Sequence, residues 1–104
     1  MKLVTKAMEA KMPKLYSTEN IPQEEKQIFA KFFMPDGNFT WYAIEGQKEE
    51  NGDITFFGLV DSVHDRELGY FTLSQLQQAR GALRLPVERD LHFDNKNIRL
   101  GDII

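Results

Sequence analysis

Apolar and polar positions in the middle of the chain follow the pattern of a β-sheet. The stretch "QIFAKFFM" (27–34) is short, aromatic and free of glycine and proline, which is typical of a strand. "PDGN" (35–38) predicts a hairpin turn, with Asp36 and Gly37 at the two positions that need positive φ. "FTWYAIE" (39–45) is then predicted to return as the second strand.

Regular alternation divides the aromatic residues of the second strand between two faces. The odd-numbered residues from Phe39 to Glu45 would point one way, and the even-numbered residues, Tyr42 among them, would point the other way. Trp41 and Tyr42 are therefore not predicted to form one stacking surface.

Two further strands follow. "ITFFGLVDS" (54–62) is apolar on both faces, as expected of a central strand, and Gly58 inside it indicates a bulge or a close backbone approach. "ELGYFTL" (67–73) is the fourth strand, and the segment 84–93 continues past Pro86 into a short edge strand.

Helical patterns occur near the start of the chain and after the fourth strand. Thr5 is predicted to cap a helix over 6–12. Ser74 is predicted to cap a second helix over 74–83, with Gln77 completing a capping box. The inward stripe of this second helix consists of Leu76, Ala79 and Leu83. The predicted fold is α+β: an antiparallel β-meander of about four to five strands with a short N-terminal helix and one helix after the fourth strand.

Composition narrows the class of protein. The 104 residues predict a single domain, 1–104, and 41% apolar residues are enough for a core. The absence of cysteine excludes disulfides, zinc–thiolate sites and cysteine nucleophiles, and fits a reducing cytoplasm. We find no signal peptide and no apolar run of membrane-spanning length, so no membrane partner is expected.

Charge is distributed unevenly along a chain whose net charge is −3. Residues 45–67 carry seven acidic and two basic side chains, a net −5. This segment is either a solvated loop region or an acidic face that meets a basic partner. The candidate partner-binding residues are Glu45, Glu49, Glu50, Asp53, Asp61 and Glu67.

Residues 80–99 are net +2 and include Arg80, Arg84 and Arg89, which suit phosphate or carboxylate groups. These arginines are the candidate residues for nucleic-acid binding. The net acidity of the chain favours the alternative that they pair with the acidic region of the same molecule.

Catalytic motifs are weak. His64 and His92 do not have recognised zinc spacings, and no nucleophile motif occurs, so neither a metal nor a cofactor is expected. Carboxylate pairs remain as the basis of a small metal-dependent hydrolase, although antiparallel pairing would place Glu45 and Asp61 apart. The candidate carboxylates are Glu45, Asp61, Glu88 and Asp90.

Several strings resemble one family of small bacterial proteins. They are "KLYSTENIP", "AKFFMPDGNFTWYAIEG", "FFGLVDS", "ELGYFTLSQL" and "RGALRLPVERDLHF", which together span about Lys2 to Phe93. The family is a domain-of-unknown-function family found on plasmids and integrative conjugative elements. The resemblance implies a setting beside DNA-processing and anti-restriction genes, but no established reaction. The sequence departs from the family pattern at Arg84, where a glycine is expected before "LP".

The sequence therefore favours a non-enzymatic accessory protein of a mobile element, acting in the cytoplasm as a monomer or homodimer. Its expected partner is a protein encoded by the host or by the element, and one form of the hypothesis is an inhibitor of a defence system such as restriction or CRISPR. The alternatives are a nucleic-acid-binding module and a small metal-dependent hydrolase.

Overall fold

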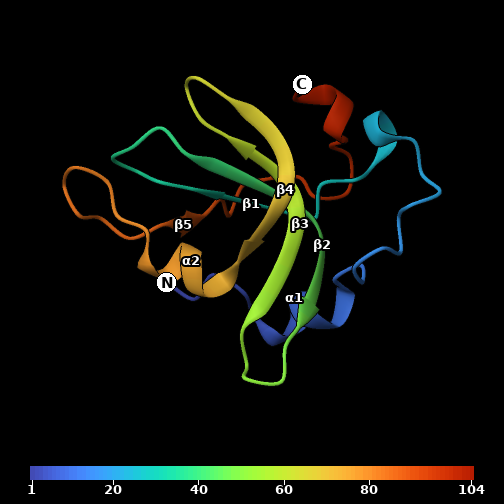
Figure 1. Cartoon of the computed structure of the whole chain (residues 1–104), viewed down its shortest axis with the longest axis horizontal. Coiled ribbons are helices and arrows are strands. Elements are labelled where there is room, and N and C mark those ends of the chain that lie inside the picture. Colours follow the sequence, from blue (N-terminus) through green and yellow to red (C-terminus); the bar gives the residue numbers. More distant parts are fainter.

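A computed structural model describes residues 1–104 and contains a five-stranded antiparallel sheet (Figure 1). The strands are β1 (Ala30–Phe33), β2 (Thr40–Lys48), β3 (Ile54–Asp61), β4 (Arg66–Thr72) and β5 (Glu88–Arg89), in the order β4-β3-β2-β1-β5. The helical elements are α1 (Lys6–Lys11), α2 (Leu73–Gln78) and the 3₁₀ turns η1 (Gln23–Glu25) and η2 (Leu100–Asp102). The predicted fold class is confirmed, including the short edge strand in 84–93.

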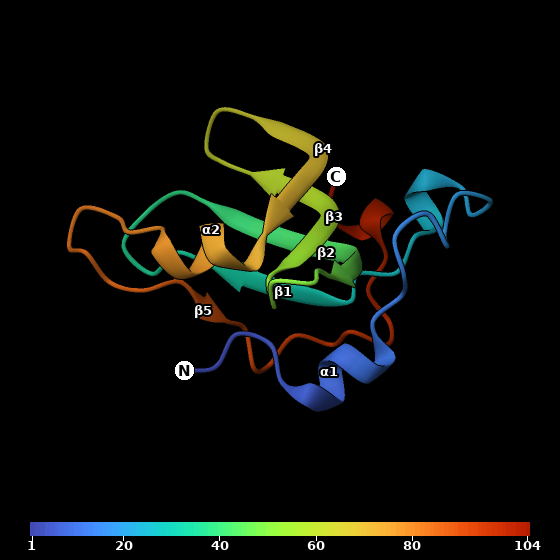
Figure 2. The ribbon, with the colours of Figure 1, turned by 60° about the horizontal axis from the view of Figure 1, so that its bottom comes forward.

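The sheet buries apolar side chains on both faces. The larger cluster contains Trp41 and Ala43, and it is closed by Leu3 and Val4 from the N-terminal segment and by Leu76 of α2. Figure 2 shows α2 in front of the sheet and α1 beneath it. The smaller cluster, on the other face, consists of Ile28, Ile44, Leu59 and Leu100, with Tyr42 packed against it. The prediction that Trp41 and Tyr42 lie on opposite faces is confirmed.

The C-terminal segment is part of the second core. Leu100 is fully buried there, and the amide of Ile28 donates to the carbonyl of Ile98 at 3.1 Å. The turns η1 and η2 lie side by side at one end of the molecule (Figure 1). The tail therefore completes the face of the sheet that neither α1 nor α2 covers.

A β-bulge changes the alternation of β2. The pairing with β3 shifts between Ala43 and Glu45, so that Ala43 opposes Gly58 and Glu45 opposes Phe57. The extra residue, Ile44, places Glu45 on the same face as Ile44. The expectation that Glu45 shares a face with Trp41 is therefore wrong, because it assumed an unbroken period of two.

The helix after β4 begins earlier and ends earlier than predicted. Thr72, not Ser74, is its N-cap, and the capping box is completed by Gln75. The helix ends at Gln78, and the Arg80 guanidinium donates to the carbonyls of Gln77 and Ala79 at 2.8 and 2.7 Å. The predicted helix over 74–83 is thus wrong in its second half. The other cap, Thr5, is confirmed: its hydroxyl accepts from the amide of Met8 at 3.2 Å.

The turn between β1 and β2 also differs from the prediction. Neither Asp36 nor Gly37 has a positive φ, so the expected turn type is wrong. The turn is closed instead by hydrogen bonds from Gly37 to the Met34 carbonyl and from Met34 to the Phe39 carbonyl. None of the helices has the length and apolar character needed to cross a membrane.

Candidate protein-binding surface

The loop 79–87, between α2 and β5, is fixed to the β1–β2 turn by Asp36. One oxygen of this carboxylate, Oδ2, accepts from the amides of Leu83 and Leu85 at 2.6 and 3.4 Å. A side chain at Gly81 would overlap the same carboxylate, so only glycine fits there without displacing it. Both segments project from the same side of the sheet in the two views (Figures 1 and 2). The Asp36 carboxylate therefore ties the loop to the β1–β2 turn, although the loop carries no regular element.

This fixed loop exposes apolar side chains. Leu83 is 74% exposed, and Leu85 and Phe39 are each 42% exposed. The Phe39 ring stacks on the buried Trp41 with 5.7 Å between ring centroids. We call Phe39, Leu83 and Leu85 the apolar knuckle. These apolar side chains, exposed on two joined loops, make the knuckle the candidate surface for contact with another protein.

Sequence reasoning missed the knuckle because it placed Leu83 on the inward stripe of the second helix. The helix ends at Gln78, so Leu83 lies beyond it and faces solvent. Gly81 and Pro86 were the signals of an early end, since both residues disfavour a continuing helix.

Arg84 at the tip of the loop has a φ of 61°, in the left-handed region that favours glycine. This is the position where the family pattern implies a glycine. We expect Arg84→Gly to raise the free energy of unfolding by about 0.5 kcal/mol, because relief of backbone strain exceeds the entropy that glycine adds to the unfolded chain. Urea unfolding of Arg84→Gly and Arg84→Ala measures this: alanine keeps the strain, so equal stabilities for the two variants would contradict the prediction.

The six candidate acidic residues do not form one surface. Glu45 is only 4% exposed, and its carboxylate accepts from the amides of Tyr16 and Thr18 at 2.8 and 3.1 Å and from the Thr18 hydroxyl. Two backbone amides thus converge on one carboxylate, with Tyr16 in the left-handed region. The hydroxyl of the nearby Tyr16 raises the pKa of Tyr70, and burial and the charge of Glu45 act in the same direction.

Asp53 and Asp61 are also engaged within the molecule. Asp53 accepts from the amide and the hydroxyl of Ser74 at 3.0 and 2.7 Å, which ties β3 to the start of α2. The Ser74 hydroxyl, followed by the amide of Ile54, holds the pKa of Asp53 below its ordinary value. Asp61 pairs with Arg66 at 3.2 Å.

The other three candidates are less engaged. Glu49 and Glu50 lie in the turn between β2 and β3, and Glu67 lies near the opposite end of the sheet, on β4. Glu50 and Glu67 are exposed, and Glu49 is partly exposed. The structure therefore brings Glu49 and Glu50 together but separates them from Glu67.

The candidate arginines do not pair with the acidic region, so that expectation is wrong. Arg80 donates instead to the carbonyls at the end of α2. Arg89 donates to the carbonyls of Lys2 and Leu3 at 3.1 and 2.9 Å, which holds the N-terminal segment against β5. Arg84 alone extends from the loop with no hydrogen bond from its guanidinium. Arg80 and Arg89 therefore satisfy backbone carbonyls rather than carboxylates of residues 45–67.

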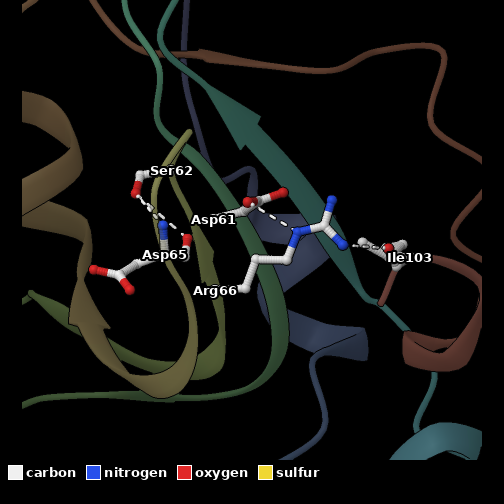
Figure 3. Close-up of polar contacts among 5 residues, drawn as sticks. All are labelled: Asp61, Ser62, Asp65, Arg66 and Ile103. Atoms are coloured by element: carbon white, nitrogen blue, oxygen red, sulfur yellow. Dashed lines mark hydrogen bonds and ion pairs between the residues drawn. The ribbon is translucent and has the colours of Figure 1, made fainter.

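The turn between β3 and β4 borders a shallow polar hollow of about 500 Å³. The Ser62 hydroxyl is occupied by the backbone of Asp65, from which it accepts at 3.1 Å and to which it donates at 3.3 Å. The Arg66 guanidinium donates to the Asp61 carboxylate at 3.2 Å and to the carbonyl of Ile103 at 2.9 Å (Figure 3). These contacts fasten the turn and the C-terminus, and they leave no paired nucleophile and base.

The candidate carboxylates of the hydrolase hypothesis are dispersed. In the β2–β3 register, Glu45 opposes Phe57 and Asp61 opposes Thr40. This confirms that antiparallel pairing separates Glu45 from Asp61. Asp90 pairs with Lys31 at 3.5 Å, and Glu88 opposes Phe33 at the sheet edge. No group of three or more histidine and acidic side chains lies together as a metal site would need.

Fold and surface together define a small α+β domain with a five-stranded antiparallel sheet and a fixed, exposed apolar loop. The chain belongs to the family described as protein of unknown function (DUF2958), whose model matches residues 3–101. The match extends beyond Phe93 and includes Leu100, in agreement with the place of the tail in the core. Neither a curated protein nor a solved structure matches the chain.

Proposed function

We propose that the protein is a non-enzymatic accessory protein that acts by binding another protein, with the apolar knuckle as the anchor of the interface. The observation that carries the proposal is Leu83: it is 74% exposed on a loop that Asp36 ties to the β1–β2 turn. An exposed leucine on a fixed loop loses little conformational freedom on binding and removes apolar surface from water.

The surroundings of Leu83 support the same role. Phe39 is backed by the buried Trp41, so its ring is held in place before a partner arrives. Arg84 supplies a free cationic group at the tip of the loop. Aromatic and arginine side chains are enriched among the residues that contribute most to protein interfaces.

The biological form of the proposal follows from the resemblance to proteins of plasmids and conjugative elements. The partner would be encoded by the host or by the element, and blocking a restriction or CRISPR system is the form we would examine first. Glu49 and Glu50, close together in the β2–β3 turn, would serve to attract a basic partner over a distance rather than to anchor it.

Affinity capture from nuclease-treated host lysate, with matched variants as bait, tests the proposal. We expect a stoichiometric protein partner with the wild type and at least a tenfold loss with Leu83→Ser, since truncation of an interface anchor costs more than about 1.4 kcal/mol. Leu83 is exposed, so the variant should keep its fold. Glu49→Lys with Glu50→Lys should retain the partner but bind it more slowly.

Other outcomes would overturn the proposal in different ways. Undiminished capture by Leu83→Ser would remove the knuckle from the interface. Loss of capture only in the glutamate variant would return the interface to the acidic turn. Partners that disappear on nuclease treatment would replace the proposal with a nucleic-acid-binding module.

A further inference from the structure

A second surface differs in chemistry from the knuckle and lies at the N-terminal helix. The first 14 residues contain four lysines and one glutamate, a net +3, whereas the remaining 90 residues contain nine basic and 15 acidic side chains, a net −6. A strong charge asymmetry in a small domain indicates a binding surface for a charged partner.

The lysines border a hollow of about 750 Å³ between α1 and the end of β2. Lys6 of α1, Lys14 after it and Lys48 of β2 line the hollow, together with Met12 and Gly46. The amide of Gly46 donates to the carbonyl of Pro13 at 2.8 Å, which fixes the segment after α1 on β2. Met12 occupies the space where a side chain at Gly46 would lie. The hollow is therefore a consequence of the fold.

The lining of the hollow is cationic. Glu9 is its one carboxylate, and it pairs with Lys48 at 3.4 Å. Lys6 and Lys14 are exposed and form no ion pair within the chain. Glu49 and Glu50 follow Lys48 in the sequence but do not line the hollow. Three lysines and one glutamate give the lining a net +2, and its apolar residues are Met12 and Ala10.

We propose that this hollow binds an acidic peptide segment of a protein partner. Carboxylates of the segment would meet the ammonium groups of Lys6 and Lys14, and an aliphatic side chain would cover Met12. An acidic peptide fits better than a nucleic acid, because the hollow has no aromatic side chain on which bases could stack.

The site stands independently of the knuckle, because it uses no residue of the loop 79–87 or of the β1–β2 turn. A failed capture experiment with Leu83→Ser would leave it untouched. A failed peptide titration would likewise leave the knuckle untouched.

An NMR titration of the ¹⁵N-labelled protein tests the site directly. The probe is a synthetic peptide in which glutamates flank a leucine, and the comparison ligands are an oligothymidylate of the same length and inorganic phosphate. We expect amide shifts confined to α1, Met12, Lys14 and residues 46–48. Lys6→Gln with Lys14→Gln should weaken binding about tenfold, and raising the salt to about 0.3 M should weaken it further.

Lys96→Gln is the matched control, because Lys96 is exposed outside the hollow and should leave the affinity unchanged. Glu9→Gln should tighten binding, since it frees Lys48 from its ion pair. The proposal is overturned if peptide at about 1 mM produces no shifts around the hollow, or the same shifts in the double lysine variant. Tighter binding of the oligothymidylate than of the peptide would overturn the ligand class.

Discussion

Replacing Glu45 by alanine is expected to lower the free energy of unfolding by about 3 kcal/mol. The carboxylate accepts hydrogen bonds from the amides of Tyr16 and Thr18 and from the Thr18 hydroxyl. Lys26 in turn donates to the carbonyl and hydroxyl of Thr18, so one carboxylate organises the connector, defined here as residues 13–26. Removing it leaves two backbone amides without their acceptor and detaches the connector from the sheet.

Glu45→Gln keeps the volume of the side chain but removes one of its two hydrogen-bond acceptors, so it tests the two contributions separately. Glutamine has one carbonyl oxygen, and its NH₂ group would face one of the three donors. Glu45→Gln should therefore lose most of the free energy of unfolding that Glu45→Ala loses. Urea unfolding measures the loss, and hydrogen exchange should show faster exchange at Tyr16 and Thr18 than in the wild type. Glu50→Gln is the control, since an exposed carboxylate should change stability by less than about 0.5 kcal/mol. Equal stability of Glu45→Ala and the wild type would show that the connector is held by other contacts.

The sheet could be predicted from the sequence because its signals are local. Each strand has its own apolar pattern, and consecutive strands are neighbours joined by short turns, so β1 to β4 follow one another in the sheet. The close backbone approach at Gly58 is predictable for the same reason, because a glycine inside an apolar strand usually marks a bulge or a neighbouring backbone that leaves no room for a side chain.

Two of the errors have a different cause, which is contact between residues far apart in the sequence. The local pattern assigns Asp36 to a turn, but Asp36 accepts hydrogen bonds from Leu83 and Leu85, 47 and 49 positions later. The same kind of pattern assigns Ser74 to a helix cap, but Ser74 donates to Asp53, 21 positions earlier. The local pattern cannot show whether a polar side chain will bond to a nearby backbone group or to a group far along the chain, because either partner satisfies its hydrogen-bonding capacity.

The sequence could predict which types of charged residue are candidates for binding, but not where they lie in the fold. The sequence identified acidic residues in 45–67, but a bulge at Ile44 turned Glu45 into the core, and Asp53 and Asp61 found partners within the chain. The knuckle depends on where α2 ends, and the lysine hollow depends on α1 lying beside the end of β2. Both surfaces arise from tertiary placement, so charge counts along the chain could indicate the hollow but could not locate it.

Gly58→Ala is expected to cost about 3 kcal/mol, because a side chain at this position would meet backbone rather than flexible side-chain atoms. An added Cβ would overlap the Tyr42 carbonyl oxygen and lie 3.0 Å from the Cα of Ala43. Since Ala43 opposes Gly58 at the bulge, β2 would have to shift there, and the shift would reach Glu45.

Gly69→Ala is the matched control, because Gly69 opposes Gly58 on β4 and nothing lies within 4 Å of its added Cβ. Its stability should equal or slightly exceed that of the wild type, since alanine lowers the entropy of the unfolded chain. If Gly58→Ala acts through the bulge, combining it with Glu45→Ala should cost less than the two separate losses together. Full additivity in urea unfolding would mean that Gly58 and Glu45 stabilise the fold independently, and that the bulge does not transmit the strain to the connector.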